Sequence, residues 1–100
     1  MAKVTEHAKE NMRVFAKVVG QVKADALKAK VAEVIHTNVE SIAVVVALDK
    51  PVANPIRDDW KLNDRLVAII RNQQVRTVML SRKEQIHKSH LRTEVISLVA

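Results

Sequence analysis

The fold is decided by a stretch of seventeen residues, RLVAIIRNQQVRTVMLS, at positions 65–81. Two runs rich in β-branched residues, 65–71 and 75–81, flank the polar residues 72–74. Branched side chains favour strands, and so short a connection joins strands that lie side by side in opposite directions. The stretch therefore predicts a β-hairpin.

The charges of the second run fall near its ends. Arg76 and Arg82 have the same parity as Val78 and Leu80, so alternation places all four on one side of the strand. Since the two arginines flank the apolar middle, we expect positive charge to gather at the ends of the sheet.

The chain on either side of the hairpin predicts further strands. Residues 42–48, IAVVVAL, form an apolar run typical of a strand buried on both faces. Two prolines predict a loop over residues 51–59, and Asn63–Asp64 predicts a turn. After a short helix near residues 85–91, the β-branched residues of 93–99 favour a closing strand.

The first third of the chain has helical patterning. Thr5 is a suitable N-cap, and the apolar residues that follow recur on one helical face: Ala8, Met12, Phe15 and Val19. Gly20 either ends this helix or interrupts a longer one. A second apolar face comprises Leu27, Val31, Val34 and Ile35, and the helix should stop near residues 37–38. No strand is predicted before the first helix.

Together these elements predict one α+β domain over residues 1–100, helical over 5–36 and forming a sheet over 42–99. We expect two N-terminal helices packed on a three- or four-stranded, mainly antiparallel sheet.

Composition excludes several kinds of site. The absence of cysteine rules out disulfides and thiolate zinc sites, and a single glycine rules out phosphate-binding loops. His87 and His90 are spaced for one helical face but lack a third ligand, so we predict no metal and no cofactor. The N-terminus does not resemble a signal peptide, and no apolar run is long enough to span a bilayer. We therefore expect a cytoplasmic protein without membrane contact.

Positive charge is concentrated late in the chain. Lysine and arginine number 17 against 11 acids, a formal charge of +6. Between positions 71 and 92 a single acid, Glu84, faces six basic residues, which are Arg71, Arg76, Arg82, Lys83, Lys88 and Arg92. Such an excess attracts phosphate backbones or acidic protein surfaces, so the expected partner is RNA or an acidic protein.

Two motifs carry a family resemblance. The segment LNDRLVAIIRNQQVRTVML at 62–80, followed by Arg82 and Lys83, and the opening TEHAKENM at 5–12 resemble small prokaryotic toxins of the barnase/RelE-type ribonuclease fold. Toxins of this kind are found on phages, on plasmids and in toxin–antitoxin modules. The resemblance implies metal-independent RNA cleavage, with basic side chains stabilising the charge that develops on phosphate.

The resemblance also implies roles for particular residues. Arg82 matches the basic position after the hairpin, His7 matches the histidine of the first helix, and His87 is added as a general acid or base. We expect these three to be catalytic, or to bind RNA in an inactive relative. The predicted RNA-binding residues are Arg71, Arg76, Lys83, Lys88, His90 and Arg92.

Two other functions stay open. A non-enzymatic inhibitor encoded by a phage or plasmid would dock a basic face on an acidic host protein. A plain nucleic-acid-binding module would bind without turnover. In each case an exposed sheet edge could support a homodimer.

Overall fold

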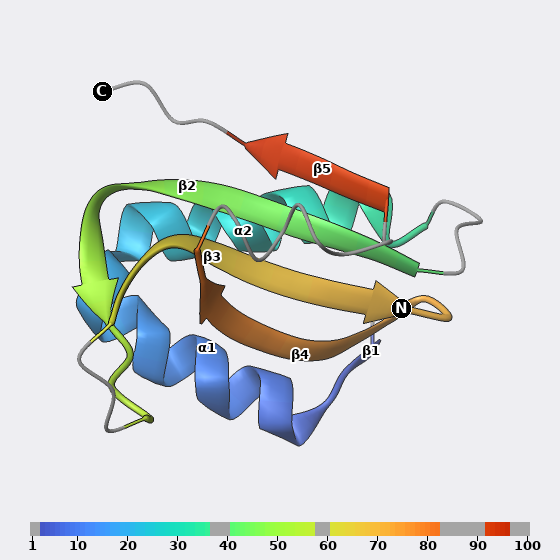
Figure 1. Cartoon of the computed structure of the whole chain (residues 1–100). Helices are drawn as coiled ribbons and strands as arrows, with labels where there is room; N and C mark the ends of the chain where they lie inside the picture. Colours follow the sequence, from blue (N-terminus) through green and yellow to red (C-terminus); the bar gives the residue numbers. More distant parts are fainter. Residues whose placement is uncertain (1–2, 37–40, 58–60, 83–91, 97–100) are drawn as a thin grey trace.

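The computed structural model describes residues 3–36, 41–57, 61–82 and 92–96, with Lys3 and residues 92–96 described by their backbone alone. The helices are α1 (Glu6–Val19) and α2 (Gln21–Val34). The strands are β1 (Lys3–Val4), β2 (Ser41–Ala53), β3 (Leu62–Arg71), β4 (Gln74–Ser81) and β5 (Arg92–Ile96). They form one sheet in the order β1-β4-β3-β2-β5 (Figure 1).

The centre of the sheet is the predicted hairpin extended by one strand. β2 pairs with β3, and β3 with β4, both antiparallel. The hairpin turns at Asn72 and Gln73, whose φ angles of 52° and 62° give the left-handed backbone that matches the twist of paired strands. The α+β prediction, with helices packed on a sheet whose centre is antiparallel, is confirmed.

The edges of the sheet differ from the prediction. Lys3 and Val4 form β1, which pairs in parallel with Gln74 and Val75 of β4. β5 pairs in parallel with residues 42–46 of β2. The prediction of no strand before the first helix was therefore wrong, and the sheet has five strands. Two residues are too short for alternation to reveal a strand, since tertiary pairing creates it.

Two predicted connections also belong to strands. β2 continues through Pro51 to Ala53, after an irregularity between Ala47 and Val52. β5 pairs only with residues 42–46 of β2. Pro51, which has no backbone N–H to donate, lies beyond this stretch, where β2 has no described neighbour on the β5 side. The predicted turn at Asn63–Asp64 is instead part of β3, with Asn63 opposite Val52.

Local sequence accounts for both helices. The Thr5 side chain caps α1 by accepting a hydrogen bond from the Ala8 N–H at 3.1 Å. Gly20, with φ 93° and ψ 151°, separates α1 from α2, which settles the alternative left by the sequence. The predicted apolar faces are buried at Ala8, Met12, Phe15, Leu27, Val31, Val34 and Ile35.

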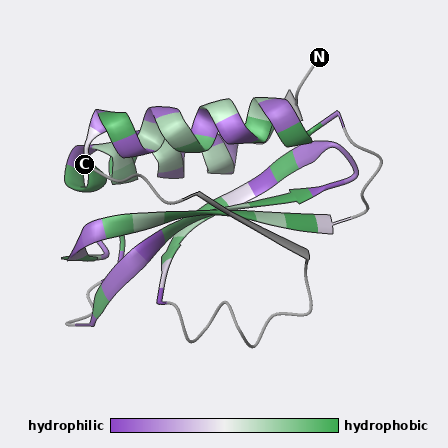
Figure 2. Ribbon diagram, turned by 90° about the horizontal axis from the view of Figure 1, so that it is seen from above, coloured by the Kyte–Doolittle hydropathy of each residue, from purple (hydrophilic) through white to green (hydrophobic). Residues whose placement is uncertain are grey.

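Both helices cover one face of the sheet (Figure 2), and the main core lies between them and that face. Residues 42–46 are all buried, as predicted for a strand covered on both faces. A smaller buried group lies on the opposite face at Ala43, Val45 and Val67. The predicted helix near 85–91 and the end of the closing strand lie outside the described residues. Neither described helix is long and apolar enough to cross a membrane.

Candidate nucleic-acid interface

The topology gathers several chain ends at one end of the sheet, which we call the hairpin end (right in Figure 1). β3 ends and β4 begins there, as fixed by the pairing of Arg71 with Gln74. α1 starts beside this end because β1 pairs with the first residues of β4. β2 and β5 also begin there, since Ile42 lies between Ile70 and Arg92. The opposite end holds the α1–α2 junction and the β2–β3 connection, and we call it the far end.

Arg71 and Arg76 place two exposed guanidinium groups at the hairpin end. Arg71 is the last residue of β3. Arg76 lies in a β-bulge, because Ile70 pairs with Val75 while Ile69 pairs with Thr77. A bulge re-aims one side chain relative to the regular alternation.

Because of the bulge, Arg76 does not lie on the side of β4 that regular alternation predicts. Regular alternation would place Arg76 on the same side as Val78, which is 2 % exposed against α1. A guanidinium buried there without a partner would be costly. The extra residue lets Val75 and Val78 both face the core while Arg76 remains exposed.

His7 is anchored beside β4 through a neighbour on α1. The Asn11 amide nitrogen Nδ2 donates a hydrogen bond to the Val78 carbonyl at 3.1 Å and lies 3.2 Å from Nε2 of His7. Because an amide nitrogen can only donate, Nε2 acts as the acceptor in this contact. The other ring nitrogen, Nδ1, is then left as the donor of the exposed imidazole.

Thr5 ties the same region together. Its hydroxyl donates to the Arg76 carbonyl at 3.1 Å, and its N–H donates to the Val75 carbonyl at 3.1 Å. The start of α1 and the bulge of β4 are thereby held side by side, which keeps His7 and Arg76 on the same part of the molecule.

Carboxylates near the hairpin end are engaged within their own helices. Glu6 pairs with Lys9 at 3.6 Å, and Glu33 pairs with Lys30 at 3.3 Å. The third is Glu10, which accepts from Arg13 Nε at 3.1 Å. The hydrogen bond from Arg13, with added attraction from Arg13 and Lys17, holds the pKa of Glu10 below its ordinary value.

No described carboxylate pairs with Arg71 or Arg76, in contrast to Lys9, Arg13 and Lys30 of the helices. An exposed guanidinium without an intramolecular acid offers its donors to an external anion. The hairpin end is therefore electrostatically suited to bind phosphate or carboxylate groups.

Large exposed apolar side chains of the described residues lie elsewhere. Val18 and Val22 flank the α1–α2 junction, Ile56 belongs to the β2–β3 connection, and Leu62 is the first residue of β3. Met79, opposite Val67 in the register, lies toward the far end of β4. The large exposed apolar side chains that the structure describes thus lie away from the hairpin end.

The predicted site residues are distributed over both ends. His7, Arg71 and Arg76 share the hairpin end, and the backbone of Arg92 begins β5 there. Arg82 follows Ser81, which pairs with Arg65 at the far end. Six residues of strand separate Arg82 from Arg76, or about 20 Å. Lys83, His87, Lys88 and His90 lie outside the described residues.

His36, just after α2, is exposed on the side of the molecule where β2 begins. One feature of this surface was missed from the sequence: Asn11 anchors His7, and its spacing of four residues on one helix was the available signal. Within the described part of the chain, no group of three or more His, Asp or Glu side chains could hold a metal ion.

Comparison with known proteins identifies no relative of this chain. No protein-family model, no curated protein and no solved structure matches this chain.

Proposed function

We propose that this protein binds RNA through the hairpin end, with Arg71 and Arg76 contacting phosphates and His7 lying beside them. The observation that carries the proposal is the pair of exposed arginines without a described acidic partner, next to acids already engaged within α1 and α2. Neutralising phosphates with basic side chains supplies most of the affinity of such sites.

RNA is favoured over an acidic protein by the lack of exposed apolar residues there. The core of a protein–protein interface is depleted of charge and rich in apolar and aromatic side chains. The exposed large apolar residues that the structure describes lie toward the far end instead. A surface of arginine, histidine and polar backbone suits a phosphate backbone better.

Binding is favoured over cleavage by the positions of the candidate catalytic groups. The Val78 carbonyl, which Asn11 links to His7, lies four residues of strand before Arg82, or about 13 Å. Proton transfer and charge stabilisation at one phosphate require groups within hydrogen-bond reach of it. These two residues therefore do not support a shared catalytic site. The relationship to the toxin ribonucleases stays a hypothesis that a turnover assay can test.

The direct test is fluorescence anisotropy with a short labelled single-stranded RNA. We expect the double variant Arg71→Gln/Arg76→Gln to bind about a hundredfold more weakly or worse, since each charged hydrogen bond contributes about 1.5–3 kcal/mol. The matched control is Lys50→Gln/Arg57→Gln, which removes the same charge from exposed far-end residues. It should bind nearly as tightly as the wild-type protein.

Three outcomes would contradict the proposal. Equal losses in both variants would mean that net charge alone attracts RNA. Absence of binding by the folded wild-type protein would remove the function. Tight binding of polyglutamate but not RNA would favour an acidic protein partner. To detect metal-independent cleavage, the RNA is incubated with the wild-type protein and, in parallel, with the His7→Ala variant, both in the presence of EDTA. Cleavage by the wild-type protein that is lost in the variant would place the reaction at this end.

A further inference from the structure

A cavity of about 690 Å³ lies between the two helices and the sheet, lined by residues of α1, α2, β1, β3 and β4. Its volume is within the usual range of small-molecule sites, about 300–1,000 Å³. Because part of its lining is exposed, including Lys17, Lys28 and Ala32, the space is a groove open to solvent and accessible to a ligand.

Small side chains create the space. Alanines line it on three different elements: Ala8 and Ala16 on α1, Ala32 on α2 and Ala68 on β3. Larger apolar residues complete the walls, among them Met12, Val31 and Val78. No aromatic side chain lines the cavity, so it offers aliphatic contact without ring stacking.

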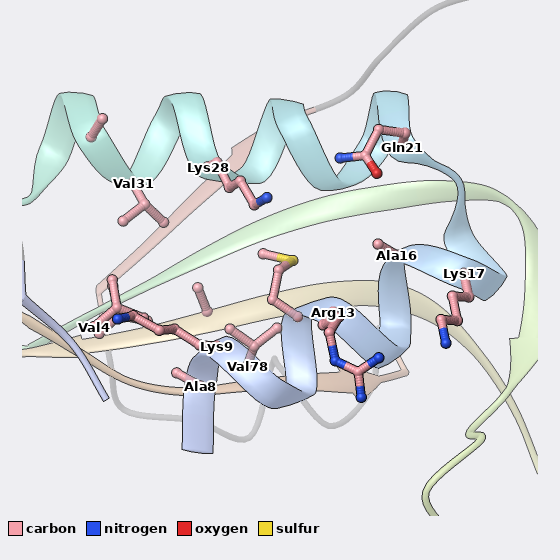
Figure 3. A pocket seen from close by; sticks show the side chains of 14 residues that line it. Val4, Ala8, Lys9, Arg13, Ala16, Lys17, Gln21, Lys28, Val31 and Val78 are labelled. Atoms are coloured by element: carbon pink, nitrogen blue, oxygen red, sulfur yellow. The ribbon is translucent and has the colours of Figure 1, made fainter. Parts of the chain in front are cut away.

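Basic side chains surround the entrance. The cavity is also lined by Lys9, Arg13 and Lys17 of α1 and by Lys28 of α2. Figure 3 shows Lys28 extending from α2 toward the space between the helices, while Arg13 and Lys17 leave α1 on the side away from α2. Every charged side chain in the lining is positive.

Two of these cations have no ion-pair partner in the described part of the chain. Lys9 is engaged by Glu6, and Arg13 by Glu10. No described acid forms a salt bridge with Lys17 or Lys28, although Lys17 lies close enough to help lower the pKa of Glu10. Lys17 and Lys28 therefore leave two unpaired ammonium groups in the lining, available to an anionic group of a ligand.

We propose that this cavity binds a linear aliphatic carboxylate, with the carboxylate at the basic rim to which Lys17 and Lys28 contribute and the hydrocarbon chain along the apolar floor. Ala8, Met12 and Ala16 lie on successive turns of α1 and offer a trough about 12 Å long. Gln21 adds an amide at the Lys17 end. The site uses none of the arginines proposed to bind RNA, so it stands independently of that function.

Isothermal titration calorimetry with dodecanoate, below its micelle concentration, tests the proposal. We expect saturable binding at one site per chain. The variant Lys17→Gln/Lys28→Gln should bind at least tenfold more weakly, whereas the matched far-end variant Lys50→Gln/Arg57→Gln should bind as the wild-type protein does. Dodecanol has the same chain without the charge and should bind the wild-type protein more weakly than dodecanoate does. The Lys17→Gln/Lys28→Gln variant should bind the two ligands about equally.

The position of the chain is tested separately. Ala16→Leu keeps a good helix former and partly fills the trough, so it should reduce affinity for dodecanoate while both helices remain folded. Methyl NMR should show dodecanoate shifting the signals of Ala8, Met12, Val31 and Val78.

Several results would overturn the proposal: no binding of dodecanoate, equal affinity of the Lys17/Lys28 variant and the wild-type protein, or shifts confined to other methyl groups. A dimer in sedimentation experiments that buries these methyls and excludes dodecanoate would show that a second copy of the chain fills the cavity instead.

Discussion

At Gly20 the backbone passes from α1 to α2 through φ 93° and ψ 151°, a combination open to glycine almost alone. Among the described residues, no atom of another part of the chain lies within 4 Å of the position that a Cβ would occupy. Gly20→Ala therefore tests backbone strain without a steric clash. We expect it to lower the free energy of unfolding by about 1–3 kcal/mol, measured by urea denaturation.

Gly20→Asn is the informative companion. Asparagine tolerates the left-handed helical region but not a ψ of 151°, so it should destabilise the protein about as much as alanine. Wild-type stability in the alanine variant would show that the helices do not join through this backbone conformation.

A second residue-scale prediction concerns Glu10. Its hydrogen bond from Arg13 lowers its pKa, so the pair stabilises the fold above the unfolded-state pKa and loses that contribution as pH falls through the lower, folded-state pKa. Carbon-13 NMR titration should show Glu10 losing its charge at lower pH than an ordinary glutamate.

Two variants separate the contributions of Arg13 and Lys17 to the lowered pKa of Glu10. Arg13→Gln should remove most of the lowering of the Glu10 pKa, and Lys17→Gln a smaller part. A Glu10 pKa that is unchanged in Arg13→Gln would contradict the assigned hydrogen bond.

Residue-level reasoning from the sequence succeeded where local chemistry decides and failed where pairing decides. Thr5 and Gly20 could be identified as a cap and a break from their residue types alone. The exposed position of Arg76 could not, because it depends on a bulge that forms only when β4 pairs with β3.

At the scale of elements, Thr5 joins α1 to β4. Its hydroxyl accepts from the Ala8 N–H and donates to the Arg76 carbonyl, each at 3.1 Å. Thr5→Ala removes both bonds and should cost about 1–2 kcal/mol of unfolding free energy in thermal or urea denaturation. It should also weaken RNA binding, because His7 and Arg76 lose their common anchor.

Thr5→Ser retains the hydroxyl and is the matched control. It should keep most of the stability and the RNA affinity. Equal destabilisation in serine and alanine variants would show that the threonine methyl, and not the two hydrogen bonds, stabilises this junction.

Element prediction was reliable for long, periodic segments. The two helical faces and the hairpin have many residues that repeat one signal, whereas β1 has only two residues and owes its existence to β4. Pro51 argued for a loop, yet β2 accommodates it beyond the stretch paired with β5. These differences arise from sheet contacts that are distant in sequence.

At the scale of the whole molecule, the two ends of the sheet carry different exposed side chains. The hairpin end carries exposed arginine and histidine, and the far end carries the described exposed apolar residues. The sequence predicted a concentration of positive charge between positions 71 and 92. It also placed Arg76 and Arg82 at the two ends of one strand, and the register agrees, since Ser81 beside Arg82 pairs with Arg65 at the far end.

The measurement that tests RNA binding at the hairpin end most directly is the salt dependence of the affinity for single-stranded RNA. For single strands the slope of log K against log salt concentration is about −0.7 for each phosphate neutralised. If Arg71 and Arg76 each contact one phosphate, Arg71→Gln/Arg76→Gln should make the slope shallower by about 1.4, with Lys50→Gln/Arg57→Gln unchanged. An unchanged slope in the first variant, or the same change in both, would contradict the account.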